Sequence, residues 1–337
     1  MLRNLARFCF RRRWLVAIGW IVLLAVLLFL NQTVGGDFSD EFDLPGTESQ
    51  RALDILKEKG FGTRGGFSGQ VVFDAEQGVT DPTVREAMES LFSEIVESVP
   101  DTSVQSPYSL EGQRQVAPDG RIAYAEVNFG DRANPEYRAA SKQIHEMVDR
   151  VEVPGLTVEL GGDVFVGEPA FSSEAFGFLA AMVILLIAFG SLLAMGLPIV
   201  TALFGIGTGV AVVGLAAHIV DMPSFSNQAM LMIAIGVGID YALFIVTRYR
   251  ESLHRGMDPE EATAQAMSTA GRAVLFAGTT VVIAILGLFL IGLALIQGLA
   301  VGIAIGVLTT MTASLTLLPA VLGFVGRNID RLGLPHA

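Results

Sequence analysis

The hydrophobic and polar residues are so unevenly distributed that they predict membrane-spanning helices. No Asp, Glu, Lys or Arg occurs in the 46 residues from Ala175 to Val220 or in the 54 residues from Ala273 to Gly326. A helix of ~20 apolar residues crosses a bilayer, so each run is long enough for two crossings. Gly190-Ser191 interrupts the first run and the segment Gly292–Gln297 interrupts the second. Each run therefore predicts two helices joined by a short turn.

Two more apolar segments bring the predicted number of transmembrane helices to six. They are Trp14–Leu30 and Gln228–Thr247, the latter with one carboxylate. The six spans are expected at about 14–30, 174–190, 192–219, 226–247, 272–292 and 297–325. Asp258, followed by Pro259, predicts the cap of a helix at about 258–269 on the membrane surface.

Residues 31–173, between the first two spans, have the pattern of a folded domain. Thr47 predicts the start of a helix that ends at Lys59. After it, alternation and helical spacing predict strands and helices at 69–73 (strand), 81–98 (helix), 102–108 (strand), 121–128 (strand), 134–150 (helix) and 156–160 (strand). This βαββαβ order predicts an α+β, ferredoxin-like domain inserted between helices 1 and 2 of an α-helical integral membrane protein.

Composition and charge agree with a membrane protein. The 337 residues are 52% hydrophobic and 17% charged, whereas soluble domains carry about 25% charged residues. The net charge of −12 argues against nucleic acid as a partner, because a phosphate backbone would be repelled. Residues 31–175 hold 27 acidic and 11 basic side chains, so this segment accounts for the negative charge.

The basic residues also predict the orientation in the membrane. All 11 basic residues outside 31–175 fall in segments that six spans place on one side: Arg3, Arg7, Arg11, Arg12, Arg13, Arg248, Arg250, Arg255, Arg272, Arg327 and Arg331. Short cytoplasmic segments are enriched in Lys and Arg. We therefore expect residues 1–13 and the tail 327–337 to be cytoplasmic and 31–173 to lie outside a cytoplasmic (inner) membrane. The first span has no small-residue cleavage site after it and is expected to stay attached.

Other motifs offer little chemistry. Cys9 is the single cysteine, and we expect a buried thiol rather than an acylated one. Gly60–Gly65 has the GxGxxG spacing of dinucleotide sites, but a predicted helix precedes it instead of a strand, so a glycine turn is expected. The sequence contains no phosphate loop, catalytic triad pattern or metal-ligand cluster. We expect neither an enzyme nor a cofactor.

Asp240 is the residue that carries candidate chemistry. It lies 13 residues after Asn227 and 8 before Arg248, which places it ~20 Å and ~12 Å from the two ends of its span. A charge at the centre of a span costs at least ~2.5–3.5 kcal/mol. We therefore expect Asp240 to face the interior of the helix bundle and to load and release a proton, with the hydroxyl of Tyr241 beside it.

Small and hydroxylated residues surround this acid in the sequence. Gly236 and Gly238 would let a neighbouring helix approach, and further glycines at helical spacing predict close packing elsewhere: Gly205, Gly209, Gly298, Gly302 and Gly306. Thr280 is a weak candidate for the relay, because most intramembrane threonines bond to their own helix.

The segment Gly236–Glu251 resembles the fourth-helix signature of the MMPL family in the RND superfamily of transporters. Leu44–Ser49 and Gly271–Phe276 resemble further landmarks of that family, and the layout of one helix, an outer domain and five helices resembles one RND half. The resemblance implies proton-driven export of lipids or hydrophobic compounds, with Asp240 and Tyr241 as the proton relay. In some relatives a serine follows the Gly271–Phe276 segment, where this chain has Ala277.

The resemblance leaves the assembly open. It implies a second Asp–Tyr pair from a second half, which would be the missing part of a longer chain, a second copy of this chain, or another chain. In a self-pair, Asp240 would face Tyr241 of the partner subunit. An alternative function is a non-transporting lipid-sensing, sterol-sensing or assembly module of the same architecture, which would tolerate substitution of Asp240.

Overall fold

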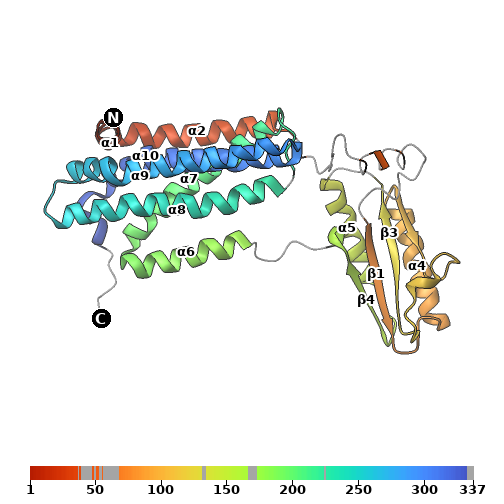
Figure 1. Cartoon of the computed structure of the whole chain (residues 1–337). Helices are drawn as coiled ribbons and strands as arrows, with labels where there is room; N and C mark the ends of the chain where they lie inside the picture. Colours follow the sequence, from red (N-terminus) through yellow and green to blue (C-terminus); the bar gives the residue numbers. More distant parts are fainter. Residues whose placement is uncertain are drawn as a thin grey trace. The chain divides into compact units, whose positions relative to one another are not determined.

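The structure, a computed structural model, divides into two units (Figure 1). We call Met1–Asp43 with Ala170–Ala337 the helical unit and Leu44–Pro169 the small unit. The described residues are 1–36, 38, 48, 51, 52, 55, 68–130, 134–165, 173–223 and 225–331. The predicted glycine turn at Gly60–Gly65, and most of the helix predicted from Thr47 to Lys59, lie outside them.

The helical unit is built from long apolar helices that pack side by side. Five of its described helices are long and apolar enough to cross a membrane: α2 (Arg13–Val34), α7 (Leu192–Ala216), α8 (Phe225–His254), α9 (Pro259–Leu286) and α10 (Ala294–Val325). α10 packs against α7, α8 and α9, while α2 packs against α7 (Figure 1). α6 (Ser173–Phe189), the second predicted span, is apolar but has 17 residues. Five helices of spanning length are therefore present in the described part, where the sequence predicts six.

Two of the turns between these helices contain a glycine with a positive φ, a backbone conformation that other residues rarely adopt. Gly190 has a φ of 62° and separates α6 from α7, whose N-cap is Ser191. The Ser191 hydroxyl also donates to the carbonyl of Ile329 at 2.7 Å. Gly292, with a φ of 77°, separates the short helix η5 (Gly287–Ile291) from α10. Both predicted interruptions are confirmed.

Two helices differ from the prediction. The structure has α1 (Leu2–Arg11) ahead of the first span, with Ala6 and Cys9 buried. The separate surface helix predicted at 258–269 is wrong, because α9 continues without a break through Arg272. Asp258 does cap it, accepting from the backbone N–H of Glu260 at 3.2 Å. No proline follows Pro259 before the helix ends, so nothing in the backbone stops it.

Glycines bring α7, α8 and α10 close together. A Cβ on Gly205 of α7 would lie 2.7 Å from the Cα of Thr310 on α10, closer than atoms can pack. A Cβ on Gly306 of α10 would lie 2.5 Å from Cγ of Met230 on α8. Helices in membranes associate through such small residues because lipid gives no hydrophobic drive between them. The predicted packing role of these glycines is confirmed.

The small unit has one four-stranded antiparallel sheet. Its elements follow the order β1 (Ser68–Ala75), α4 (Pro82–Ser98), β2 (Thr102–Gln105), β3 (Ile122–Phe129), α5 (Asn134–Val148) and β4 (Leu156–Gly161). The strands lie in the order β2-β3-β1-β4, and every pair is antiparallel. Each predicted strand and helix from residue 68 onward is present. β2 is three residues shorter than predicted, since Pro107 has no N–H for the ladder.

The core of the small unit lies between one face of the sheet and its helices. Alternate residues of β1 and β3, such as Phe73 and Val127, are fully buried. They form one hydrophobic cluster with Met88 and Ile95 of α4 and Ile144 of α5. The strand period of 2 and the helix period of 3.6 thus direct the apolar residues to the same layer.

Candidate functional site

Asp240 and Tyr241 are neighbours on α8 but face different surroundings. Successive helical residues point about 100° apart. Tyr241 is 7% exposed and belongs to the core of the helical unit together with Ala242 and Ile245. Asp240 is exposed on the surface of that unit. The prediction that Asp240 faces the interior of this bundle is therefore wrong: the side of α8 that carries Gly238, Ala242 and Ile245 packs inward, and Asp240 lies away from it.

Tyr241 reaches the space between α9 and α10. A Cβ on Gly278 of α9 would lie 3.3 Å from the Tyr241 hydroxyl and 2.5 Å from Sδ of Met311 on α10. Gly278 thus provides the room that the tyrosine side chain occupies. Sequence reasoning did not single out Gly278 or Met311; the signal available for Gly278 was the absence of a side chain within the apolar part of its helix.

The two glycines beside Asp240 have different roles. A Cβ on Gly238 would lie 3.3 Å from Cβ of Ala202 and 3.2 Å from Cγ2 of Thr310, so neighbouring helices do approach there, as predicted. The same expectation for Gly236 is wrong within this chain, because no described atom lies within 4 Å of a Cβ placed on it. Gly236 is exposed on the side of α8 that carries Asp240.

These residues define an exposed strip on α8 that we call the Asp240 face. Its members recur at intervals of four residues along the helix: Met232, Gly236, Asp240 and Phe244. Met232 is 59% exposed and Phe244 63% exposed. The acid therefore lies in a strip that is otherwise apolar, with an open gap at Gly236 one turn away.

Thr280 is exposed on α9, and its hydroxyl donates to the carbonyl of Phe276 at 2.9 Å. Thr279 donates to Leu275 in the same way at 2.7 Å. The hydroxyl of Thr310 on α10 also bonds to its own helix, at 2.8 Å from the Gly306 carbonyl. The prediction of back-bonded threonines is confirmed. No hydrogen bond in the described structure joins Thr280 to Asp240 or Tyr241, and its part in a relay stays a prediction.

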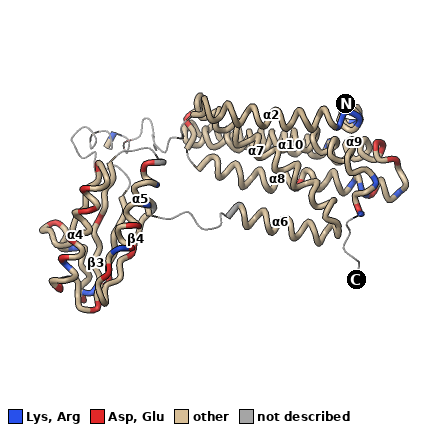
Figure 2. Tube along the Cα trace, turned by 180° about the vertical axis from the view of Figure 1, so that it is seen from behind, with Lys and Arg blue, Asp and Glu red and all other residues tan. Residues whose placement is uncertain are grey.

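The arginines of the helical unit gather at one end of the helices (Figure 2). Arg3 and Arg7 of α1 both pair with Glu261 of α9, Arg7 at 2.8 Å. Arg11 pairs with Glu260 at 2.9 Å. At the same end, the short helix η6 (Gly326–Asp330) is tied to α8 by Arg250 and His254, which lie 2.7 Å and 2.9 Å from the Asp330 carboxylate. The segments that the sequence predicts on one side of the membrane therefore contact one another.

The small unit presents the other face of its sheet uncovered. Residues that alternate with the buried ones on β1, β3 and β4 remain at least partly exposed: Gln70, Val72, Asp74, Tyr124, Glu126, Asn128 and Glu159. Three of these are carboxylates, and Asp74 pairs with Arg121 at 3.2 Å. The open face is thus mixed in character, with an acidic bias. In the part of the chain that the structure describes, no group of three His, Cys, Asp or Glu residues could hold a metal ion.

Taken together, the apolar helices and the charge-free spans define a multi-pass membrane protein. Residues 41–332 match the MMPL family, and the chain belongs to this family of the RND superfamily.

Known relatives are transporters or membrane proteins. Membrane protein YdfJ of Bacillus subtilis is 36% identical over 98% of this chain and 46% of that protein. The mycolic acid-containing lipids exporter MmpL11 of Mycolicibacterium smegmatis is 28% identical over 94% of this chain and 34% of that protein. The chain thus spans less than half the length of these relatives. A crystal structure of SecDF in its super-membrane-facing form aligns with 93% of this chain and 37% of that one, at 14% identity and a TM-score of 0.44.

Proposed function

We propose that this chain is one half of a proton-driven MMPL transporter that exports lipids or other hydrophobic compounds, with Asp240 as its proton carrier. The observation that carries the proposal is a carboxyl group exposed on the apolar surface of a membrane-spanning helix. A bare charge at that depth would cost at least ~2.5–3.5 kcal/mol. Binding a proton removes the charge, and releasing it restores the cost, so the protonation state can bias the position of the helix.

The Asp240 face supports a second half as the partner. An ionisable residue in a membrane faces the interior of a bundle or a water-filled cavity rather than lipid. A partner helix seated in the gap at Gly236 would create such an interior around Asp240. The lengths of the relatives agree, since this chain covers 46% of YdfJ and 34% of MmpL11. Tyr241 is buried within its own unit, so we propose that it supports α8 from inside while the partner supplies polar groups to Asp240.

The small unit is proposed to be a ferredoxin-like porter domain on the outer side of the membrane. Its order of elements and its antiparallel sheet support the fold, and the open sheet face offers a surface for cargo. The gathering of arginines at one end of the helical unit supports a cytoplasmic location for that end. The relative named as an exporter of mycolic acid-containing lipids supports a lipid cargo.

The test is the substitution Asp240→Asn, which removes the titratable proton and keeps the shape of the side chain. We expect proton-dependent export in proteoliposomes to be lost, with unchanged yield and thermal unfolding. Glu251→Gln is the matched control on the same helix, because the Glu251 side chain is 42% exposed and its ion pair in the described structure is with Arg248. Export by Asp240→Asn at the level of the control would contradict the proposal and would favour the sensing or assembly module.

A further inference from the structure

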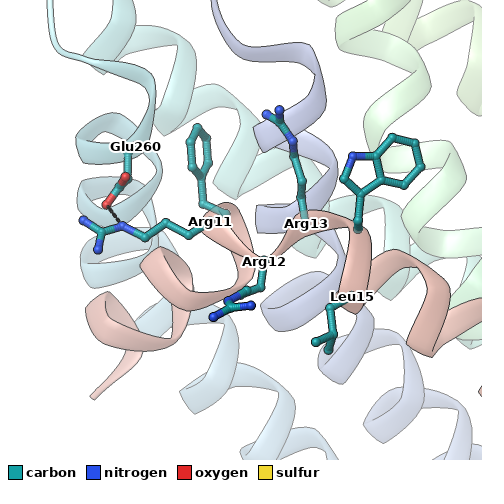
Figure 3. A pocket seen from close by; sticks show the side chains of 7 residues that line it. Arg11, Arg12, Arg13, Leu15 and Glu260 are labelled. Atoms are coloured by element: carbon teal, nitrogen blue, oxygen red, sulfur yellow. Dashed lines mark hydrogen bonds and ion pairs between the residues drawn. The ribbon is translucent and has the colours of Figure 1, made fainter.

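A hollow lies at the junction of α1 and α2, where the amphipathic helix meets the first apolar span (Figure 3). Its volume is about 460 Å³. The residues that line it are Phe10, Arg11, Arg12, Arg13, Trp14, Leu15 and Glu260. Three consecutive arginines therefore border one small space beside an indole ring.

Two of the three arginines already have protein partners. Arg11 pairs with Glu260, Nε to Oε1 at 2.9 Å. Arg13 donates to the carbonyl of Gly323, and its guanidinium lies 5.3 Å from the centre of the Phe324 ring. The exposed guanidinium of Arg12 has no acidic or carbonyl partner among the described residues. Arg12 is therefore the arginine of this hollow that is available to an external anion.

The surrounding charges favour an anion. Five arginines lie within the first 13 residues, and in the described structure three of them pair with two carboxylates, Glu260 and Glu261. An excess of three positive charges remains.

The apolar surroundings favour a lipid over a free anion. Trp14 is 67% exposed and Leu15 60% exposed directly after the arginines, and tryptophan is enriched where a span meets the headgroups. Arg12 and Leu15 project to the same side of the turn between α1 and α2 (Figure 3). From Leu15 the exposed stripe continues along α2 through Ile18 and Val22, which are 53% and 54% exposed. A phospholipid whose phosphate binds Arg12 would place its acyl chains along this stripe.

We propose that the hollow binds the phosphate headgroup of one anionic phospholipid, with Arg12 as the main donor. Guanidinium is the group best suited to phosphate, because it offers several donors in a fixed fork. The bound lipid would join α1 to the start of α2. This site is independent of the proton relay, which lies in the middle of α8.

Native mass spectrometry of the full chain in detergent, titrated with phosphatidylglycerol, tests the proposal. The Arg12→Gln variant should bind the first lipid about fivefold more weakly, as expected for one basic residue at a membrane surface. Arg12→Lys should recover part of the loss. The matched control is Arg255→Gln, because Arg255 is also exposed, lies outside the hollow and has no acidic partner among the described residues; this variant should bind like the unchanged chain.

Two further arms distinguish the sources of phosphate. Phosphatidylcholine, which has no net charge, should bind more weakly than phosphatidylglycerol and equally to both glutamine variants. Inorganic phosphate at millimolar concentration should not displace the phosphatidylglycerol. Equal binding of phosphatidylglycerol by Arg12→Gln and Arg255→Gln would overturn the proposal, and so would displacement by inorganic phosphate.

Discussion

Asp240 and Tyr241 show how adjacent residues of one helix serve different purposes. The tyrosine fills space between α9 and α10 that Gly278 leaves open, so it fixes α8 within its own unit. The acid lies on the exposed side of the same turn. A change in the charge of Asp240 would therefore act on the surface of the unit, while the opposite side of α8 remains anchored.

The thiol of Cys9 is buried by the fold, which lowers its reactivity. Its side chain is 2% exposed, and burial raises the pKa of the thiol to about 11. Because the thiolate is the reactive form, we predict that iodoacetamide at pH 8 labels the folded protein at least about a hundredfold more slowly than the denatured chain. Mass spectrometry of the labelled protein measures both rates.

The same pKa shift affects stability in a defined direction. The thiol of Cys9 holds its proton more tightly in the folded state than in the unfolded state. The contribution of this group to the free energy of unfolding is therefore complete below about pH 8.5 and is lost as the pH rises through about 11. In the iodoacetamide experiment, equal labelling rates of the folded and the denatured protein would contradict the burial of Cys9.

At the scale of helices, packing depends on where glycine allows backbones to meet. Gly205 and Gly196 both lie in α7, but a Cβ on Gly205 would meet the backbone of Thr310, whereas a Cβ on Gly196 would meet nothing within 4 Å. The two positions therefore separate the cost of overpacking from the gain in helix propensity that any Gly→Ala change brings.

We predict that Gly205→Ala destabilises the protein by about 1–3 kcal/mol, because α7 and α10 must separate to admit the methyl group. Gly196→Ala should leave stability unchanged or slightly higher. Thermal unfolding in detergent, followed by the loss of monodisperse protein, measures both variants. If the two variants unfold at the same temperature, the close contact of α7 with α10 is not as described.

The sequence predicts elements well and the orientation of their faces less well. In the small unit, period-2 alternation and a capped, periodic helix identify β1, α4, β3 and the elements that follow. In the membrane, α8 is apolar on every side, so its pattern does not indicate which side packs inward. For this reason the exposure of Asp240 does not follow from the sequence. The charge-free run that starts at Ala273 predicts a new helix near Arg272, but arginine is a good helix former and α9 continues through it.

At the scale of the whole molecule, the Asp240 face is an exposed strip that the second half would cover in the proposed transporter. Met232 and Phe244 are large and exposed, while Gly236 leaves a gap between them and Asp240 lies beside that gap. Such a strip suits a partner helix that approaches at the glycine and surrounds the acid. The chain also spans less than half the length of these two relatives. This length supports the proposal that the partner helix belongs to a second half.

We predict that Gly236→Leu fills this gap and weakens association with the second half, while the fold of the single unit is unchanged because Gly236 is exposed and a Cβ there meets no atom within 4 Å. The mass of the assembled species in mild detergent measures the association. Gly196→Leu is the control, since that glycine also has open space but lies on another helix. Unaltered assembly of Gly236→Leu would show that the Asp240 face is not the interface.

In the proposed transport cycle, Asp240 gains and loses a proton. Infrared difference spectroscopy of the reconstituted protein, with Asp240→Asn to assign the signal, tests it most directly. We expect a carboxyl band that appears and disappears when the pH outside the vesicles is stepped across the physiological range, and that is absent from the variant. A spectrum in which Asp240 stays neutral or stays ionised throughout would contradict it.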